Sequence, residues 1–263
     1  MDTAIGLRLE TALRVYLTAC RRLRTERDLD GLLNLLVSVA DPDLRLHRFG
    51  EHLRSRSADE AAWSLASLHE RVVRGDPRAH HVGLGLLDEG RLARVVPAER
   101  LQAAAAILHR RGHASAGLFR KEANRTNAGD ADVLPRPKEP VGSRISLARR
   151  ALAGIIERLL FDPDARVVRV LLGNPRLTEA EVLKLAASRR AHPDALEAIT
   201  PADRWIVRYP VKVALANNPA TPMRIVLGLL PYLVRQDLLD LCAGDSRPEI
   251  RAHAASLLAR RSV

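Results

Sequence analysis

Short internal repeats constrain the fold of this chain more than any other feature. The residues DPDLRLHR at 41–48 match DPDARVVR at 162–169, which gives the shared pattern D-P-D-x-R-apolar-x-R. An Asn-Pro turn at Asn174 recurs at Asn218, 44 residues later. A period in the low forties is typical of a two-helix unit that stacks on its neighbours, because one helical hairpin cannot bury its own apolar face. The repeats therefore predict stacked helical units.

The best-formed copy resembles a known repeat family. Residues 245–254 read DSRPEIRAHA, which resembles the D-x-x-x-x-V-R-x-x-A core of the HEAT-like helical repeats, with Ile250 in place of Val. The Asn-Pro…Thr-Pro turns resemble the leucine-rich-variant subgroup. The resemblance is clearest over residues 157–260 and implies a short α-solenoid without a particular activity. One branch of that subgroup holds an iron–sulfur cluster on clustered cysteines, whereas Cys20 and Cys242 lie far apart here.

Composition agrees with an all-α fold. Aromatic residues make up only 3% of the chain, and Ala, Leu and Arg, which are strong helix formers, dominate it. A β-sandwich or barrel would contain more aromatic and β-branched residues. Residues 167–172 and 206–215 are rich in β-branched side chains and also fit strands. We favour helices there, with a break in the second segment at Pro210.

One segment separates the chain into two halves. Residues 121–144, KEANRTNAGDADVLPRPKEPVGSR, combine Pro, Gly and charge with almost no apolar periodicity, which is typical of a flexible linker. This predicts an N-terminal helical domain over residues 1–120 and a C-terminal HEAT-like repeat domain over residues 145–263.

Local signals predict several helix positions. Apolar spacing predicts helices over residues 3–23, 29–39 and 44–53, and one stripe from Ile145 to Leu159. Two capping boxes predict helix starts, at Ser57 with Glu60 and at Thr178 with Glu181. Pro97 and Pro222 fit the first position of a helix, the latter after an N-cap at Thr221.

The basic balance has two interpretations. The net charge is +11, and 38 of the 42 basic residues are arginine. A polyanion partner would explain the charge, but the Arg and Ala content also fits a GC-rich genome.

In the repeats, an arginine follows the acidic turn by about one helical turn. The ladder interpretation predicts that these arginines, Arg48, Arg169, Arg208 and Arg251, each contact the next repeat and so hold the stack together. A row of arginines facing phosphates is the alternative. The candidate binding-surface or ladder residues are Arg48, Arg166, Arg169, Arg204, Arg208, Arg247 and Arg251.

No motif of catalysis or cofactor binding is complete. His109 and His113 have the spacing of a metal pair but lack a third ligand nearby, and neither a P-loop nor a G-x-S-x-G motif is present. We therefore expect no enzyme, cofactor or metal. One enzymatic alternative is a HEAT-like DNA glycosylase for alkylated purines, in which Trp205 beside Asp203 would contact the lesion; we favour Trp205 as a core residue.

The sequence thus predicts a non-enzymatic scaffold or adaptor that binds a protein partner. A nucleic-acid-binding module is the alternative, and a peripheral membrane role is a third. No window of about 18 residues is free of charge, so we expect no transmembrane segment, and the N-terminus lacks the pattern of a signal peptide. Two distant cysteines fit a reducing compartment, which predicts a cytoplasmic location.

Overall fold

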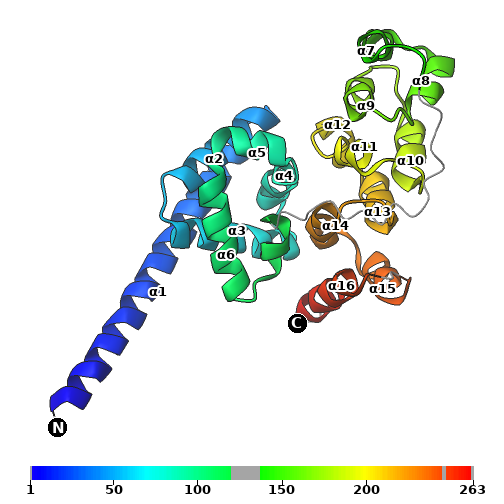
Figure 1. Cartoon of the computed structure of the whole chain (residues 1–263). Helices are drawn as coiled ribbons and strands as arrows, with labels where there is room; N and C mark the ends of the chain where they lie inside the picture. Colours follow the sequence, from blue (N-terminus) through cyan, green and yellow to red (C-terminus); the bar gives the residue numbers. More distant parts are fainter. Residues whose placement is uncertain (1, 120–136, 245–246, 262–263) are drawn as a thin grey trace.

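The computed structural model describes residues 2–119, 137–244 and 247–261, and within them the side chains of all residues except 2–17, 21 and 153. The described residues form α-helices and two short 3-10 helices and contain no strand, which confirms the all-α prediction. The helices gather into two groups, which correspond to the two halves of the chain (Figure 1). No helix in these ranges is both long and apolar enough to cross a membrane.

Helices α1 to α6 and one 3-10 helix build the first half. Their bounds are α1 Asp2–Val37, α2 Pro42–Arg54, α3 Ala58–Val73, α4 Pro77–Gly85, α5 Glu89–Val95, α6 Ala98–Arg110 and η1 Ala114–Phe119. Four of these helices begin at a polar side chain that accepts backbone N–H groups of the first turn, namely Asp41, Ser57, Asp76 and Asp88. The capping box of Ser57 and Glu60 is complete, as predicted. Gly112, at a φ of 62°, follows the end of α6, where a left-handed residue is required.

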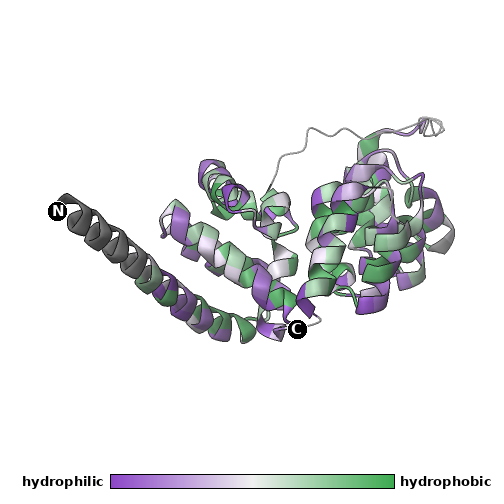
Figure 2. Ribbon diagram, turned by 90° about the horizontal axis from the view of Figure 1, so that it is seen from below, coloured by the Kyte–Doolittle hydropathy of each residue, from purple (hydrophilic) through white to green (hydrophobic). Residues whose placement is uncertain are grey.

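The prediction of two helices over residues 3–23 and 29–39 is wrong, because the single helix α1 runs through the first segment into the second. It continues without a break from Asp2 to Val37, since residues 24–28 contain no Pro or Gly that would end it. Its last turns enter the core through Leu29, Leu33 and Leu36, and the coloured turns of α1 carry both hydrophobic and hydrophilic residues (Figure 2). The helix as a whole extends away from the other helices toward its N-terminus (Figure 1).

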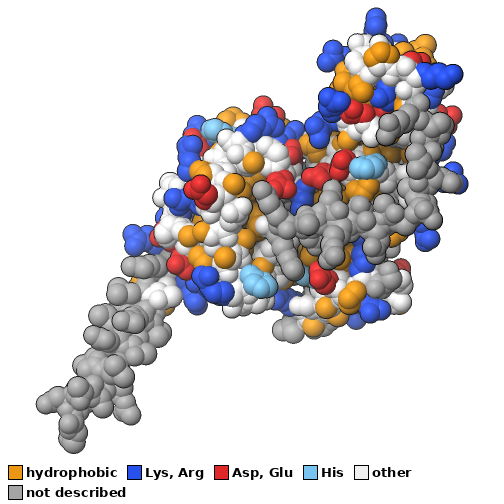
Figure 3. Space-filling model, in the orientation of Figure 1, with side chains coloured by type: hydrophobic (Ala, Val, Ile, Leu, Met, Phe, Trp, Pro, Cys, Tyr) orange, Lys and Arg blue, Asp and Glu red, His pale blue; other side chains and the backbone are white. Residues whose placement is uncertain are grey.

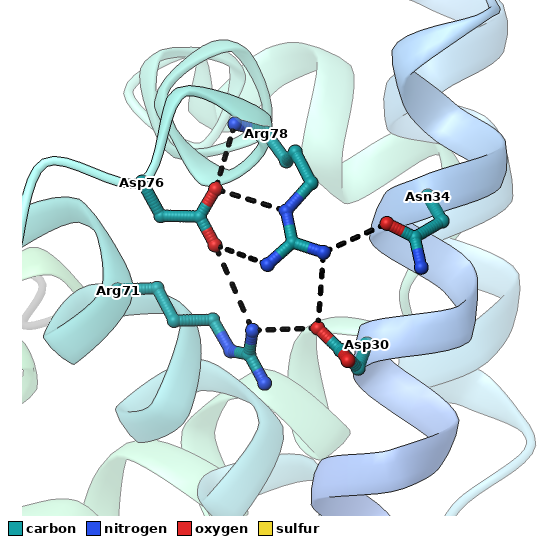
Figure 4. A network of polar contacts seen from close by, with 5 residues as sticks. All are labelled: Asp30, Asn34, Arg71, Asp76 and Arg78. Carbon is teal, nitrogen blue, oxygen red and sulfur yellow. Dashed lines mark hydrogen bonds and ion pairs between the residues drawn. The ribbon is translucent and has the colours of Figure 1, made fainter.

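A polar network holds the C-terminal part of α1 against α3 and α4 (Figure 4). Asp30 on α1 accepts a hydrogen bond from Arg71 at 2.8 Å and pairs with Arg78 at 3.2 Å. Arg78 also donates to Asn34 at 2.7 Å and to both carboxylate oxygens of Asp76, the N-cap of α4. The two guanidiniums therefore join three helices through shared carboxylates.

The second half contains the remaining helices. Their bounds are α7 Val141–Arg150, α8 Ala153–Leu159, α9 Ala165–Leu172, α10 Glu179–Ala187, α11 Pro193–Glu197, α12 Asp203–Ile206, α13 Tyr209–Asn217, α14 Met223–Leu229, η2 Leu230–Tyr232, α15 Arg235–Gly244 and α16 Pro248–Arg261. The capping box of Thr178 and Glu181 is complete. Both β-branched segments are helical, and the chain breaks at Arg208, just before Pro210.

Three boundaries differ from the predicted ones. The stripe from Ile145 to Leu159 is divided between α7 and α8, because the backbone of residues 151–152 is extended. Helices α6 and α14 begin one residue after Pro97 and Pro222, whose extended ψ of 136° places both prolines at the N-cap. Helix α7 begins at Val141, inside the predicted linker 121–144, of which residues 121–136 lie outside the described ranges.

The two Asn-Pro turns make the same contacts. The side-chain amide of buried Asn174 donates to Ala148 O at the end of α7 at 2.9 Å, and that of Asn218 donates to Ala186 O at the end of α10 at 2.7 Å. Each Asn Oδ1 accepts the N–H two residues later, Arg176 N and Ala220 N, at 2.9 Å. Both asparagines therefore close their own turn and join it to an earlier helix end.

Two arginines also recur in equivalent places. Arg204 donates to Leu177 O at 3.2 Å, and Arg247 donates to Thr221 O at 3.3 Å. Leu177 and Thr221 stand 44 residues apart, at the same position after their Asn-Pro turns. The period seen in the sequence is thus repeated in the hydrogen bonds of the second half.

The two halves pack directly against each other. Leu84 and Leu87 from the first half belong to the apolar core of the second half, and Val73 packs with the core of α14 to α16. Tyr232 Oη donates to His80 O at 3.2 Å across this contact. Gly228 faces the side chains of Leu87 and Leu118 so closely that a Cβ atom would meet them.

Candidate functional site

A cleft of about 920 Å³ lies between the two halves. The first half contributes α5 and the turn before it, and the second half contributes the end of α9 and the segment from α11 to α12. The lining residues are Asp88, Glu89, Gly90, Arg91, Ala93, Arg94, Arg169, Leu172, Gly173, Glu197, Ala198, Thr200, Pro201, Ala202, Asp203 and Arg204. The two halves must therefore be docked for the cleft to exist.

Arg91 is the central charge of one wall. Its guanidinium contacts the carboxylates of Asp43 at 2.9 Å, Asp88 at 3.2 Å and Asp203 at 3.0 Å, and only 17% of its side chain is exposed. Burial favours the neutral guanidine, but the hydrogen bond to Asp203 and the surrounding carboxylates outweigh it and raise the pKa of Arg91. Since Asp203 is on α12, this arginine also joins the two halves.

Arg224 on α14 also joins the two halves through its guanidinium. Its guanidinium donates to Leu87 O at 2.9 Å and pairs with Glu197, and its Nε lies 3.7 Å from Glu89. Only 12% of this side chain is exposed. Arg91 and Arg224 together thus pair with all four carboxylates that line the cleft.

Three lining arginines lack such a partner. Arg94 donates to Gly90 O at 3.3 Å, and Arg204 donates to Asn174 O and Leu177 O while its guanidinium lies 4.3 Å from the Trp205 ring centre. Arg169 is exposed. Among the described residues, none of the three is within ion-pair distance of a carboxylate. The cleft therefore presents guanidinium groups that can receive an anion.

The seven arginines singled out from the sequence divide into three groups. Arg48, Arg166 and Arg208 pair with Glu51, Asp164 and Glu179. Arg204 and Arg247 donate to backbone carbonyls that lie earlier in the chain. Arg169 lines the cleft, and Arg251 is exposed on α16.

Trp205 is buried, as its interpretation as a core residue requires. Its side chain is 1% exposed, and its Nε1 donates to Leu172 O at 2.7 Å. The indole is therefore held inside the second half, while its neighbours Asp203 and Arg204 line the cleft.

Sequence reasoning missed a cluster of three histidines at a second contact between the halves. His69 on α3 has ring-centre distances of 5.7 Å to His113 and 6.0 Å to His253 on α16. Burial lowers the pKa of His69 to about 3 and that of His253 to about 4, with further lowering from nearby Arg260 and the other rings. The Nε2 atoms of His69 and His253 are buried without a hydrogen-bond partner in the described structure.

Within the described ranges, these histidines are not part of any group of three or more His, Cys, Asp or Glu side chains that could hold a metal ion. His109 is exposed on α6, away from the buried rings of the cluster. The spacing of residues 69, 113 and 253 in the sequence carries no signal of their proximity, which arises only when α3 and α16 pack together.

Sequence could not have shown the cleft either. Its charged residues come from segments about a hundred residues apart, and Arg91, Arg94 and Arg224 stand in no motif. Comparison of the chain with protein-family models, curated proteins and solved structures found no match. The geometry of the site is therefore the basis for any functional conclusion.

Proposed function

We propose that this protein is a non-enzymatic scaffold or adaptor that binds a segment of another protein in the cleft between its halves. The observation that carries the proposal is the cleft itself, which has a volume of about 920 Å³ and walls from α5, α9, α11 and α12. Helical-repeat proteins bind partners on extended concave surfaces, and guanidinium groups on such a surface can form charge-assisted hydrogen bonds to a partner. The partly buried Arg91 and the exposed Arg94 and Arg169 provide such groups on both walls.

The proposal includes a short HEAT-like solenoid in the second half. The equivalent contacts of Asn174 and Asn218, and of Arg204 and Arg247, support a repeated unit. Repeat units that contact only their neighbours produce extended binding surfaces. The cleft lies where such a surface meets the first half.

Selection from a displayed random peptide library tests the proposal. The full chain is the target, and the affinity of a selected peptide is then measured by fluorescence anisotropy. Ala93→Trp places an indole in the cleft from α5, so we expect it to weaken peptide binding at least about tenfold, since close packing tolerates little added volume.

The matched control is Ala103→Trp, which adds the same side chain at an exposed position on α6. It should bind the peptide as the wild type does. Selected peptides that bind both tryptophan variants with unchanged affinity would place the partner elsewhere, and a library that yields no binder would overturn the proposal.

Nucleic-acid binding is the second candidate, and the net charge of +11 favours it. Acidic residues interrupt the basic stretches of the sequence, and Asp and Glu side chains lie among the Lys and Arg side chains on the face drawn in Figure 3. We therefore expect only weak, non-specific association with duplex DNA, with a Kd on the order of 10⁻⁴–10⁻⁶ M at physiological salt. A titration at several salt concentrations measures it. Nanomolar, sequence-selective binding at physiological salt would favour this second function over the scaffold.

A further inference from the structure

We propose that the segment bound in the cleft is acidic, an extended stretch of a partner protein that carries several Glu or Asp side chains. This inference rests on the proposed function and specifies the chemistry of its partner. It follows from how the charges of the cleft are already paired within the protein.

The carboxylates of the cleft are satisfied by the protein itself. Arg91 holds Asp88 at 3.2 Å and Asp203 at 3.0 Å, and Arg224 holds Glu197 and lies 3.7 Å from Glu89. The side chains of Arg91 and Arg224 are only 17% and 12% exposed. A basic ligand would therefore compete with these partly buried arginines for carboxylates that are already paired.

The exposed guanidinium groups of the cleft, unlike its carboxylates, have no partner of opposite charge within the described structure. Arg94 and Arg204 donate to backbone carbonyls, and Arg169 is exposed with no carboxylate partner among the described residues. A guanidinium with free N–H groups binds a carboxylate through charge-assisted, often bidentate hydrogen bonds. The cleft thus has three guanidinium groups, on α5, α9 and α12, that can each bind a carboxylate of a partner.

The placement of these arginines on both walls favours an extended segment. Arg94 is on one wall, and Arg169 and Arg204 are on the other, in a cleft of about 920 Å³. Gly90, Ala93, Gly173 and Ala202 also line the cleft and have little side-chain volume, which lets a backbone pass close to both walls. A chain with carboxylates along its length satisfies both walls together.

Defined peptides test the inference without the partner being known. The probes are three fluorescent peptides with the same Gly-Ser framework that carry glutamate, lysine or serine at alternate positions. We expect the glutamate peptide to bind the full chain at least about tenfold more tightly than the serine peptide at low ionic strength. The lysine peptide should bind no better than the serine peptide.

Charge reversal assigns the binding to the cleft. The double variant Arg94→Glu with Arg169→Glu should weaken binding of the glutamate peptide by about tenfold or more, because both positions are exposed and now repel it. The control is Arg110→Glu with Arg150→Glu, which changes the net charge equally at exposed positions outside the cleft lining. Equal loss in the two double variants would mean that the peptide responds to net charge alone, and would overturn the inference.

Two further outcomes separate this inference from the proposed function. If the library yields peptides that need the cleft but are apolar or basic, the scaffold stands and the acidic partner is wrong. If a single-stranded oligonucleotide with the same number of charges binds as tightly as the glutamate peptide and loses affinity in the cleft variant, the site binds polyanions in general. That result would overturn the assignment to an acidic protein segment.

Discussion

Asn217 and Asn218 are adjacent residues of one type in opposite surroundings. Asn218 is buried and donates to Ala186 O and Ser188 O, whereas Asn217 is exposed and donates only to Val213 O in its own helix. Asn218→Ala leaves two carbonyls without their donor, so we expect the free energy of unfolding to fall by about 1–3 kcal/mol. Asn217→Ala should change it by less than about 0.5 kcal/mol. Urea denaturation measures both, and equal effects would contradict the role given to Asn218.

The pair of Arg144 and Asp162 gives a second prediction at this scale. Both side chains are almost fully buried and are joined by short hydrogen bonds from Nη1 to the carboxylate. Arg144→Met leaves the carboxylate buried without its cation, which should lower the free energy of unfolding by about 3–5 kcal/mol.

Adding Asp162→Asn to this variant removes the unpaired charge and keeps an oxygen that can accept Asp164 N. The double variant should therefore recover a large part of the lost stability in the same urea measurement. A double variant that is less stable than Arg144→Met alone would show that Asp162 has another partner.

The repeated D-P-D motif shows which contacts of single residues could be predicted from the sequence and which could not. In the first copy Asp41 caps α2, and Arg45 donates to Val39 O. In the second copy the N-cap of α9 is Asp164, and Asp162 accepts hydrogen bonds from Arg144 instead. The motif is the same in both places, but the second copy meets an arginine from an earlier helix, which is a tertiary contact that local sequence does not contain.

Helix starts were the most predictable elements because their signals are local. Both capping boxes need only side chains three residues apart, and both are formed. The continuous α1 and the break between α7 and α8 were missed for different reasons. A polar stretch without Pro or Gly does not end a helix, and the break at residues 151–152 accompanies the contact of Asn174 with the end of α7.

The contact between α3 and α16 predicts a dependence of stability on pH. The folded protein keeps the pKa of His69 near 3 and that of His253 near 4, below the ordinary 6.5. The unfolded chain therefore binds more protons between these values, so the stability is complete above about pH 6.5 and falls as the pH drops toward 4. Glu70 contacts His113 and Arg260 at this cluster, and one carboxylate cannot offset several protonated rings.

Replacing these histidines should flatten that dependence. We expect His69→Phe and His253→Phe each to reduce the slope of unfolding free energy against pH by about 1.4 kcal/mol per pH unit between pH 6 and 5. The control His109→Phe changes an exposed ring on α6 and should leave the slope unchanged. Urea denaturation at several pH values gives the slopes, and equal slopes in all variants would contradict burial of neutral histidines at this contact.

At the scale of the whole molecule, the cleft depends on how the halves meet. Apolar residues from the first half complete the core of the second, and Arg91 and Arg224 bridge the two at the cleft. The sequence predicted helical halves and a repeated unit, since both follow from periodicity. It could not predict the cleft, because no local pattern shows which faces of the two halves pack together.

Hydrogen–deuterium exchange of the full chain, with and without a library-selected peptide, tests the central claim most directly. If the cleft is the binding site, the peptide should slow exchange in residues 88–94 and 197–204, one segment from each wall. Exchange elsewhere on the surface should stay the same. Protection confined to segments with exposed apolar side chains, such as those of Val207, Tyr209, Val234 and Leu239, with none in the two cleft segments, would contradict the account.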